Sequence, residues 1–157
     1  MLPRPFVGSY GVVSNDGIPK PNFWGFKLLS KLYPCRLALP EAHEIDCGAF
    51  TDGRNVQILL TPQSGDYYEN KQYEIDLSLV FAASNVTVQR IDDDHCNPKR
   101  LWKEIGSPDN LTRAEVASIR ERSKLIEETL PFSVENGKTV VRLSLATNDV
   151  ALITAHA

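Results

Sequence analysis

From about residue 35 onward, apolar and polar residues alternate with a period of two rather than with a helical repeat. The clearest run is QYEIDLSLV at residues 72–80, which is apolar at Tyr73, Ile75, Leu77 and Leu79. Because successive side chains of a strand point to opposite faces, this run predicts a half-buried β-strand. Further strands are expected at 85–91 and 149–157, and hairpin turns at 52–55 and 135–137.

Before this β-rich region, a short strand is predicted at residues 9–14 and a helix at 22–33, NFWGFKLLSKLY. The apolar side chains of the helix cover more than one stripe, which is unusual for the surface helix of a complete domain. A strand, a turn and a helix make half of a βαβ unit, yet no second unit follows. The residue pattern alone leaves this isolated half-unit unexplained.

Two more helices are predicted between the strands. Asn97 has a proline behind it, and Thr112 has a glutamate three residues later, so both residues have the context of an N-cap. The expected helices cover residues 98–105 and 113–124. The fold class that follows is mainly β, with antiparallel strands, two inserted helices and a preceding βα segment.

Composition limits the function. The 157 residues suit a domain of ordinary size and carry a net charge of −3, with basic residues scattered along the chain. A nucleic-acid-binding surface needs clustered lysine and arginine, so none is expected. No apolar run reaches the roughly 20 residues that cross a membrane. The proline-interrupted start is unlike a secretion signal, so the expected location is cytoplasmic.

The densest cluster of chemically active residues is DDDHC at residues 92–96. Contiguous aspartates lack the alternate spacing of a calcium loop, and they favour a capped turn over a metal site. His95 beside Cys96 does not make a catalytic dyad, because a dyad depends on geometry rather than on adjacency. The three cysteines, Cys35, Cys47 and Cys96, fit neither a disulfide framework nor a metal knuckle. We therefore expect no metal and no cofactor.

Carbohydrate chemistry has two possible bases in the residues. The chain has many carboxylates, but no local context selects the facing pair that glycoside hydrolysis requires. Aromatic side chains could stack on sugars, although tryptophans at helical spacing are usually core residues. The candidates for such a platform are Tyr67, Tyr68, Tyr73, Trp24 and Trp102.

Two motifs resemble glycoside hydrolase family 39, the family of β-xylosidases and α-L-iduronidases. Residues 8–32, GSYGVVSNDGIPKPNFWGFKLLSKL, resemble the last strand and helix of that family's catalytic (β/α)8 barrel. Residues 90–116 resemble a second segment, with matching positions at Arg90, Ile91, Asp92, His95, Asn97, Trp102, Gly106, Ser107 and Pro108. The resemblance implies a βα segment at residues 1–34 and an accessory antiparallel β-sandwich at residues 35–157.

The resemblance also implies a parent activity, the retaining hydrolysis of xylo-oligosaccharides by a xylan 1,4-β-xylosidase. Both catalytic glutamates of the family precede the matching part, so no residue here is assigned as catalytic. The chain is then expected to be an inactive C-terminal accessory portion. Its expected partners are the catalytic barrel of the parent, another copy of the chain and xylo-oligosaccharide.

The loop at residues 14–20 is the one place where the resemblance suggests substrate contact. Loops after barrel strands build active sites, so Asn15 and Asp16 would line the sugar pocket of a complete enzyme. The alternative is a turn that only positions the following helix. Two other functions stay open, a stand-alone carbohydrate-binding module and a small hydrolase with its own pair of acids.

Overall fold

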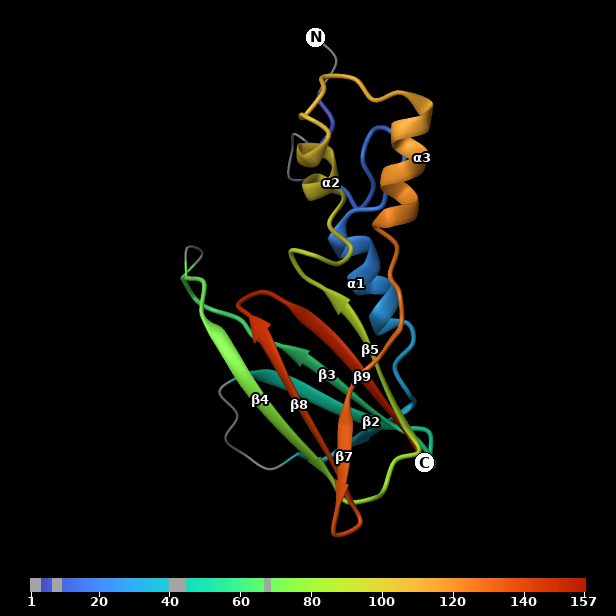
Figure 1. Ribbon diagram of the computed structural model, residues 1–157, viewed down its shortest axis with the longest axis vertical. Helices are drawn as coiled ribbons and strands as arrows, with labels where there is room; N and C mark the ends of the chain where they lie inside the picture. Colours follow the sequence, from blue (N-terminus) through green and yellow to red (C-terminus); the bar gives the residue numbers. More distant parts are fainter. Residues whose placement is uncertain (1–3, 7–9, 40–44, 67–68) are drawn as a thin grey trace. The chain divides into compact units, whose positions relative to one another are not determined.

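The computed structural model describes residues 4–6, 10–39, 45–66 and 69–157 (Figure 1). These residues are mainly β, with antiparallel strands and a few helices. The helices are α1 (Pro21–Leu29), α2 (Pro98–Glu104) and α3 (Arg113–Arg122). The strands are β1 (Cys35–Leu37), β2 (Asp46–Thr51), β3 (Val56–Thr61), β4 (Gln72–Leu79), β5 (Asn85–Ile91), β6 (Glu128–Thr129), β7 (Phe132–Glu135), β8 (Lys138–Ala146) and β9 (Val150–His156).

The chain divides into two compact units. One unit combines Met1–Ser30 with Ile91–Leu125 and holds the helices; the other combines Lys31–Arg90 with Ile126–Ala157 and holds the sheets. The inserted helices thus group with the N-terminal segment, although some 60 residues of β structure separate them in sequence. The division expected at residues 34 and 35 stays a prediction about the parent fold.

The β unit contains two antiparallel sheets. Their strand orders are β1-β2-β3-β9-β5-β6 and β4-β8-β7. A single apolar core draws on both sheets, with Leu60 of β3, Val86 of β5, Val141 and Leu145 of β8 and Ile153 of β9 at its centre. Each of these side chains is almost fully buried. Burial of apolar surface supplies most of the favourable free energy of folding in a small domain.

The period-two pattern is confirmed in β4. Tyr73, Ile75, Leu77 and Leu79 are half-buried while the residues between them are exposed. The predicted turn between β7 and β8 is also present, at Asn136 and Gly137, where φ is 52° and 76°. Positive φ at both central residues is the signature of the two-residue hairpin turn that fits the twist of the strands.

The helical unit has a smaller core of its own. Ile18, Trp102 and Ile119 are buried, and Leu101 and Val116 pack beside them. Both predicted N-caps are confirmed: Asn97 Oδ1 accepts from the main-chain N–H of Arg100, and Thr112 forms a capping box with Glu115. The two hydrogen bonds that Thr112 donates to the Glu115 carboxylate lower the pKa of that group.

The predicted strand at 9–14 is wrong for the part that the structure describes. Val13 and Pro19 form only an isolated bridge, because the chain reverses between them. The reversal is a tight turn in which the Ser14 N–H donates to the Ile18 carbonyl, with Gly17 at a φ of 74°. The helix also ends earlier than expected, at Leu29 instead of residue 33. None of the described helices is long and apolar enough to cross a membrane.

Candidate functional site

The aspartate-rich segment is a hydrogen-bonded corner leading into α2. The Asp92 carboxylate accepts from the main-chain N–H of Asp94 at 2.8 Å and from that of His95 at 2.7 Å. His95 Nδ1 lies 2.7 and 2.9 Å from the two carboxylate oxygens of Asp92. The Asp92 N–H in turn donates to the His95 carbonyl, so the corner is closed from both sides. This geometry is the capped turn that was predicted from the contiguous aspartates.

In the described residues, this corner does not have the features of a metal site or of a catalytic cysteine. Within residues 4–6, 10–39, 45–66 and 69–157, no group of three or more histidine, cysteine, aspartate or glutamate side chains is placed to hold a metal ion. Burial, and then the charge of Asp92, raise the pKa of the Cys96 thiol to about 12. Because the thiolate is the nucleophile, a pKa this high leaves very little of the reactive form at neutral pH.

Replacing Asp92 with alanine removes the acceptor of three hydrogen bonds at once, and the expected loss in unfolding free energy is about 2 kcal/mol. The side chain of Asp92 is mostly buried, so water does not replace these bonds freely. Urea denaturation of the variant measures the change. Asp93→Ala is the matched control, with an expected loss below about 0.5 kcal/mol. Equal losses in the two variants would contradict the capping role.

The Gly-Ser-Pro turn at residues 106–108 also has a structural role. Gly106 and Ser107 take φ values of 91° and 54°, which turns the chain back toward α2. The Pro108 carbonyl then accepts a hydrogen bond from Trp102 Nε1 at 3.0 Å. The Trp102 ring packs near Phe6, with ring centroids 6.0 Å apart. Trp102 is therefore a core residue and not a sugar-stacking platform.

The loop residues proposed for the sugar pocket lie on the surface of the helical unit. Asn15 and Asp16 are exposed at the tip of the turn closed by Ser14. Asp16 shares a shallow depression of about 330 Å³ with Arg113 and Arg120 of α3. A role for either residue in sugar binding stays a prediction. Tyr67 and Tyr68 lie outside the described residues.

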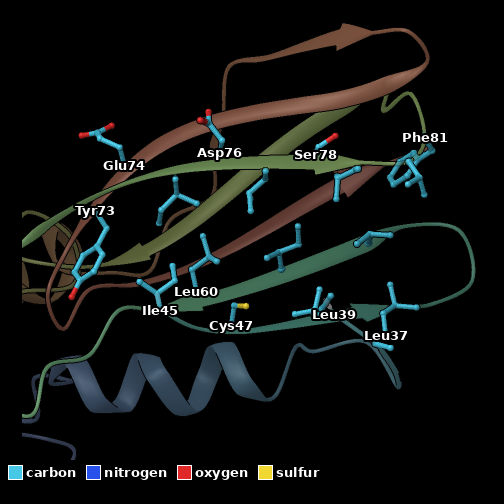
Figure 2. Close-up of a pocket in the computed structure, with 18 residues that line it drawn as sticks. Leu37, Leu39, Ile45, Cys47, Leu60, Tyr73, Glu74, Asp76, Ser78 and Phe81 are labelled. Carbon is cyan, nitrogen blue, oxygen red and sulfur yellow. The ribbon is translucent and has the colours of Figure 1, made fainter. Parts of the chain in front are cut away.

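A larger groove of about 730 Å³ lies in the β unit, between β4 on one side and β1, β2 and β3 on the other (Figure 2). Sequence reasoning missed it, because it forms between strands that are distant in sequence. Its lining is mostly apolar, and Tyr73, Leu60 and Ile45 project into it. The carboxylates on its rim, Glu74 and Asp76, point away from the interior (Figure 2). A glycosidase needs two carboxylates that face the sugar, and no such pair among the described residues lines this groove.

Two further acids, Asp94 and Glu104, are engaged in ion pairs. A small depression of about 160 Å³ in the helical unit is lined by Asp94, Glu104, Arg100 and Arg122. Arg100 pairs with Asp94 and with Glu104, and Arg122 pairs with Glu104 at 3.0 Å. All four side chains are well exposed, so the network is a solvated surface feature of small energetic weight.

Known proteins share both the sequence pattern and the fold. The family profile described as Glycosyl hydrolases family 39 matches residues 3–139. A β-xylosidase of Caldicellulosiruptor saccharolyticus is 28% identical over 156 residues, which is 96% of this chain and 32% of that protein. The chain thus spans about a third of the length of this relative.

Two solved structures have a similar fold. The family 39 enzyme of Xanthomonas axonopodis pv. citri superposes with a TM-score of 0.73 at 20% identity, over 98% of this chain and 33% of that one. A monomeric β-xylosidase from Caulobacter crescentus CB15 gives a TM-score of 0.72 at 20% identity, over 98% and 34%. The match of the family profile to most of the residues decides the assignment: this β-xylosidase-like chain belongs to glycosyl hydrolase family 39.

Proposed function

We propose that this chain is the C-terminal accessory portion of a family 39 β-xylosidase and has no hydrolytic activity by itself. In this proposal the two sheets form the accessory β-sandwich and the N-terminal segment is the last βα unit of the catalytic barrel. The observation that carries the proposal is the coverage of the alignment. It includes 96% of this chain but only 32% of its β-xylosidase relative. The parent reaction would be the retaining hydrolysis of xylo-oligosaccharides.

The surface of α1 supports a packing role for the N-terminal segment. Phe26 and Leu29 are 64% and 52% exposed, and Tyr10 ahead of the helix is 92% exposed. Leu28, on another side of the same helix, is completely buried. Exposed large apolar groups that gather on one element often mark a surface that another structure covers. The partner that suits this surface is the rest of the parent barrel, or, in its absence, a second copy of the chain.

The packing role predicts that the chain self-associates through α1. Phe26→Asp is expected to shift the protein toward monomer, because it puts a charge on the apolar surface while its exposed position leaves the core intact. Sedimentation velocity over a concentration series measures the change. Ile126→Asp, at a position 51% exposed in the β unit, is the matched control and should associate like the unmodified chain. A chain that stays monomeric at every concentration, or a Phe26→Asp variant that associates unchanged, would count against the proposal.

A further inference from the structure

Two exposed arginines of α3, Arg113 and Arg120, have no acidic partner in the part of the chain that the structure describes. The two glutamates of α3 are bonded elsewhere, Glu115 in its capping box and Glu121 to Lys124. The other arginines of the helical unit form ion pairs with carboxylates: Arg4 with Asp109 at 2.6 Å, Arg122 with Glu104 at 3.0 Å, and Arg100 with Asp94 and Glu104. The positive charges of Arg113 and Arg120 are therefore available to a ligand.

These two arginines line the same depression, the one of about 330 Å³ that also includes Asp16. Arg113 and Arg120 are seven residues apart, so they share one face of the helix at a distance of about 10 Å along its axis. Among the described residues, the Asp16 carboxylate has no hydrogen-bond or ion-pair partner. The rest of the lining is apolar and consists of Leu111, Val116 and Ala117. The depression thus combines two cations, one anion and an apolar patch.

We propose that this depression binds a sugar acid, a ligand that carries a carboxylate group and neighbouring hydroxyls. A guanidinium pairs with a carboxylate through two parallel hydrogen bonds, which favours this group over a neutral one. Because the two arginines are about 10 Å apart along the helix, one takes the carboxylate and the other a hydroxyl oxygen. The Asp16 carboxylate has only acceptor oxygens, so it binds hydroxyl donors. The apolar patch between these groups faces the C–H bonds of the sugar ring.

Asp16 distinguishes a sugar acid from simpler ligands. A plain carboxylate such as acetate, or the acidic side chain of a peptide, is repelled by Asp16 and offers it no hydroxyl. A neutral sugar satisfies Asp16 but leaves both guanidinium groups without a charged partner. Only a ligand with both kinds of group uses all of the polar side chains that line the depression. This inference does not depend on the parent activity proposed above, because it concerns binding by the helical unit alone.

The test is a titration of the 15N-labelled chain with D-glucuronate, followed by the chemical shifts of its main-chain amides. The depression is shallow, so we expect a dissociation constant on the order of 1 mM, with saturable shifts at Asp16, Ala117 and Arg120. D-Glucose lacks the carboxylate and acetate lacks the hydroxyls, and each should bind at least about tenfold more weakly. No saturable shift with glucuronate, equal affinity for glucose or acetate, or shifts that cluster elsewhere would overturn the proposal.

Variants of α3 make the test specific. Arg113→Gln and Arg120→Gln should each weaken glucuronate binding at least about tenfold, because each removes a charged hydrogen-bond donor from an exposed position. Arg122→Gln is the matched control, since it removes the same charge from the same helix at a residue that pairs with Glu104 and does not line the depression. It should bind like the unmodified chain. An equal loss in all three variants would show attraction by the overall charge of α3, and would overturn the proposal.

The variant Asp16→Asn tests the selectivity of the site. Removal of the negative charge should tighten acetate binding, so the ratio of the glucuronate affinity to the acetate affinity should fall at least about threefold. The exposed position of Asp16 leaves the core of the helical unit unchanged. The same titrations measure both affinities. A ratio that stays as it is in the unmodified chain would contradict the binding of hydroxyl groups by Asp16, and the proposal with it.

Discussion

Replacing Trp102 with alanine is expected to lower the unfolding free energy of the helical unit by about 3–5 kcal/mol. Trp102 is 7% exposed and forms the centre of the small core with Ile18 and Ile119. Its loss leaves a large cavity and also removes the donor to the Pro108 carbonyl. A loss of this size is a large share of the stability of an ordinary domain, so thermal unfolding should begin tens of degrees lower.

Two measurements separate the parts of this effect. Trp102→Phe also loses the N–H but keeps an aromatic ring that fills part of the cavity, and should cost about 1–2 kcal/mol less than alanine. Trp24 and Trp102 both belong to the helical unit, so the fluorescence of Trp24 still reports on that unit in either variant. If Trp102→Ala left the urea midpoint unchanged, this result would contradict the assignment of Trp102 to the core of the helical unit.

Replacing Leu145 with alanine is expected to destabilise the β unit by about 2–5 kcal/mol. Leu145 is 1% exposed on β8, in the core that both sheets share, and its removal leaves a cavity that rigid strands fill poorly. Circular dichroism in the far ultraviolet follows the unfolding of the sheets. Val80→Ala is the matched control, because Val80 is 88% exposed, and its expected cost is below about 0.5 kcal/mol.

The variants Trp102→Ala and Leu145→Ala also test whether the helical unit and the β unit unfold separately. If Leu145→Ala lowers the β-sheet signal while the tryptophan signal stays at its original midpoint, the units unfold separately. Coincident shifts would mean that they unfold as one cooperative body. A Leu145→Ala protein no less stable than Val80→Ala would contradict the shared core.

Local features of the fold could be predicted from the sequence. The caps at Asn97 and Thr112, the turn at Asn136–Gly137 and the alternation in β4 each depend on residues within a few positions of one another. Their chemistry is the same in any tertiary context. The corner at Asp92 was predictable for the same reason, since its carboxylate bonds to groups two and three residues away.

Features that depend on distant pairing could not be predicted. The groove requires β4 to face strands more than ten residues earlier in the chain, and no local pattern indicates that spacing. The grouping of α2 and α3 with the N-terminal segment depends on contacts across the whole β region. The strand expected at 9–14 is absent from the described residues 10–14, where the chain reverses in a turn between Ser14 and Ile18, and Ile18 is buried in the core of the helical unit.

The absence of hydrolytic activity is the most direct test of the proposed function. The purified chain is incubated with an aryl β-xyloside beside a complete family 39 β-xylosidase as the positive control. We expect no release of the aryl group above buffer, because the groove carboxylates Glu74 and Asp76 point away from its interior, and Asp94 and Glu104 are held in ion pairs with Arg100. Turnover that rises in proportion to the amount of chain, and that falls when Glu74 or Asp76 is changed to its amide, would contradict the account.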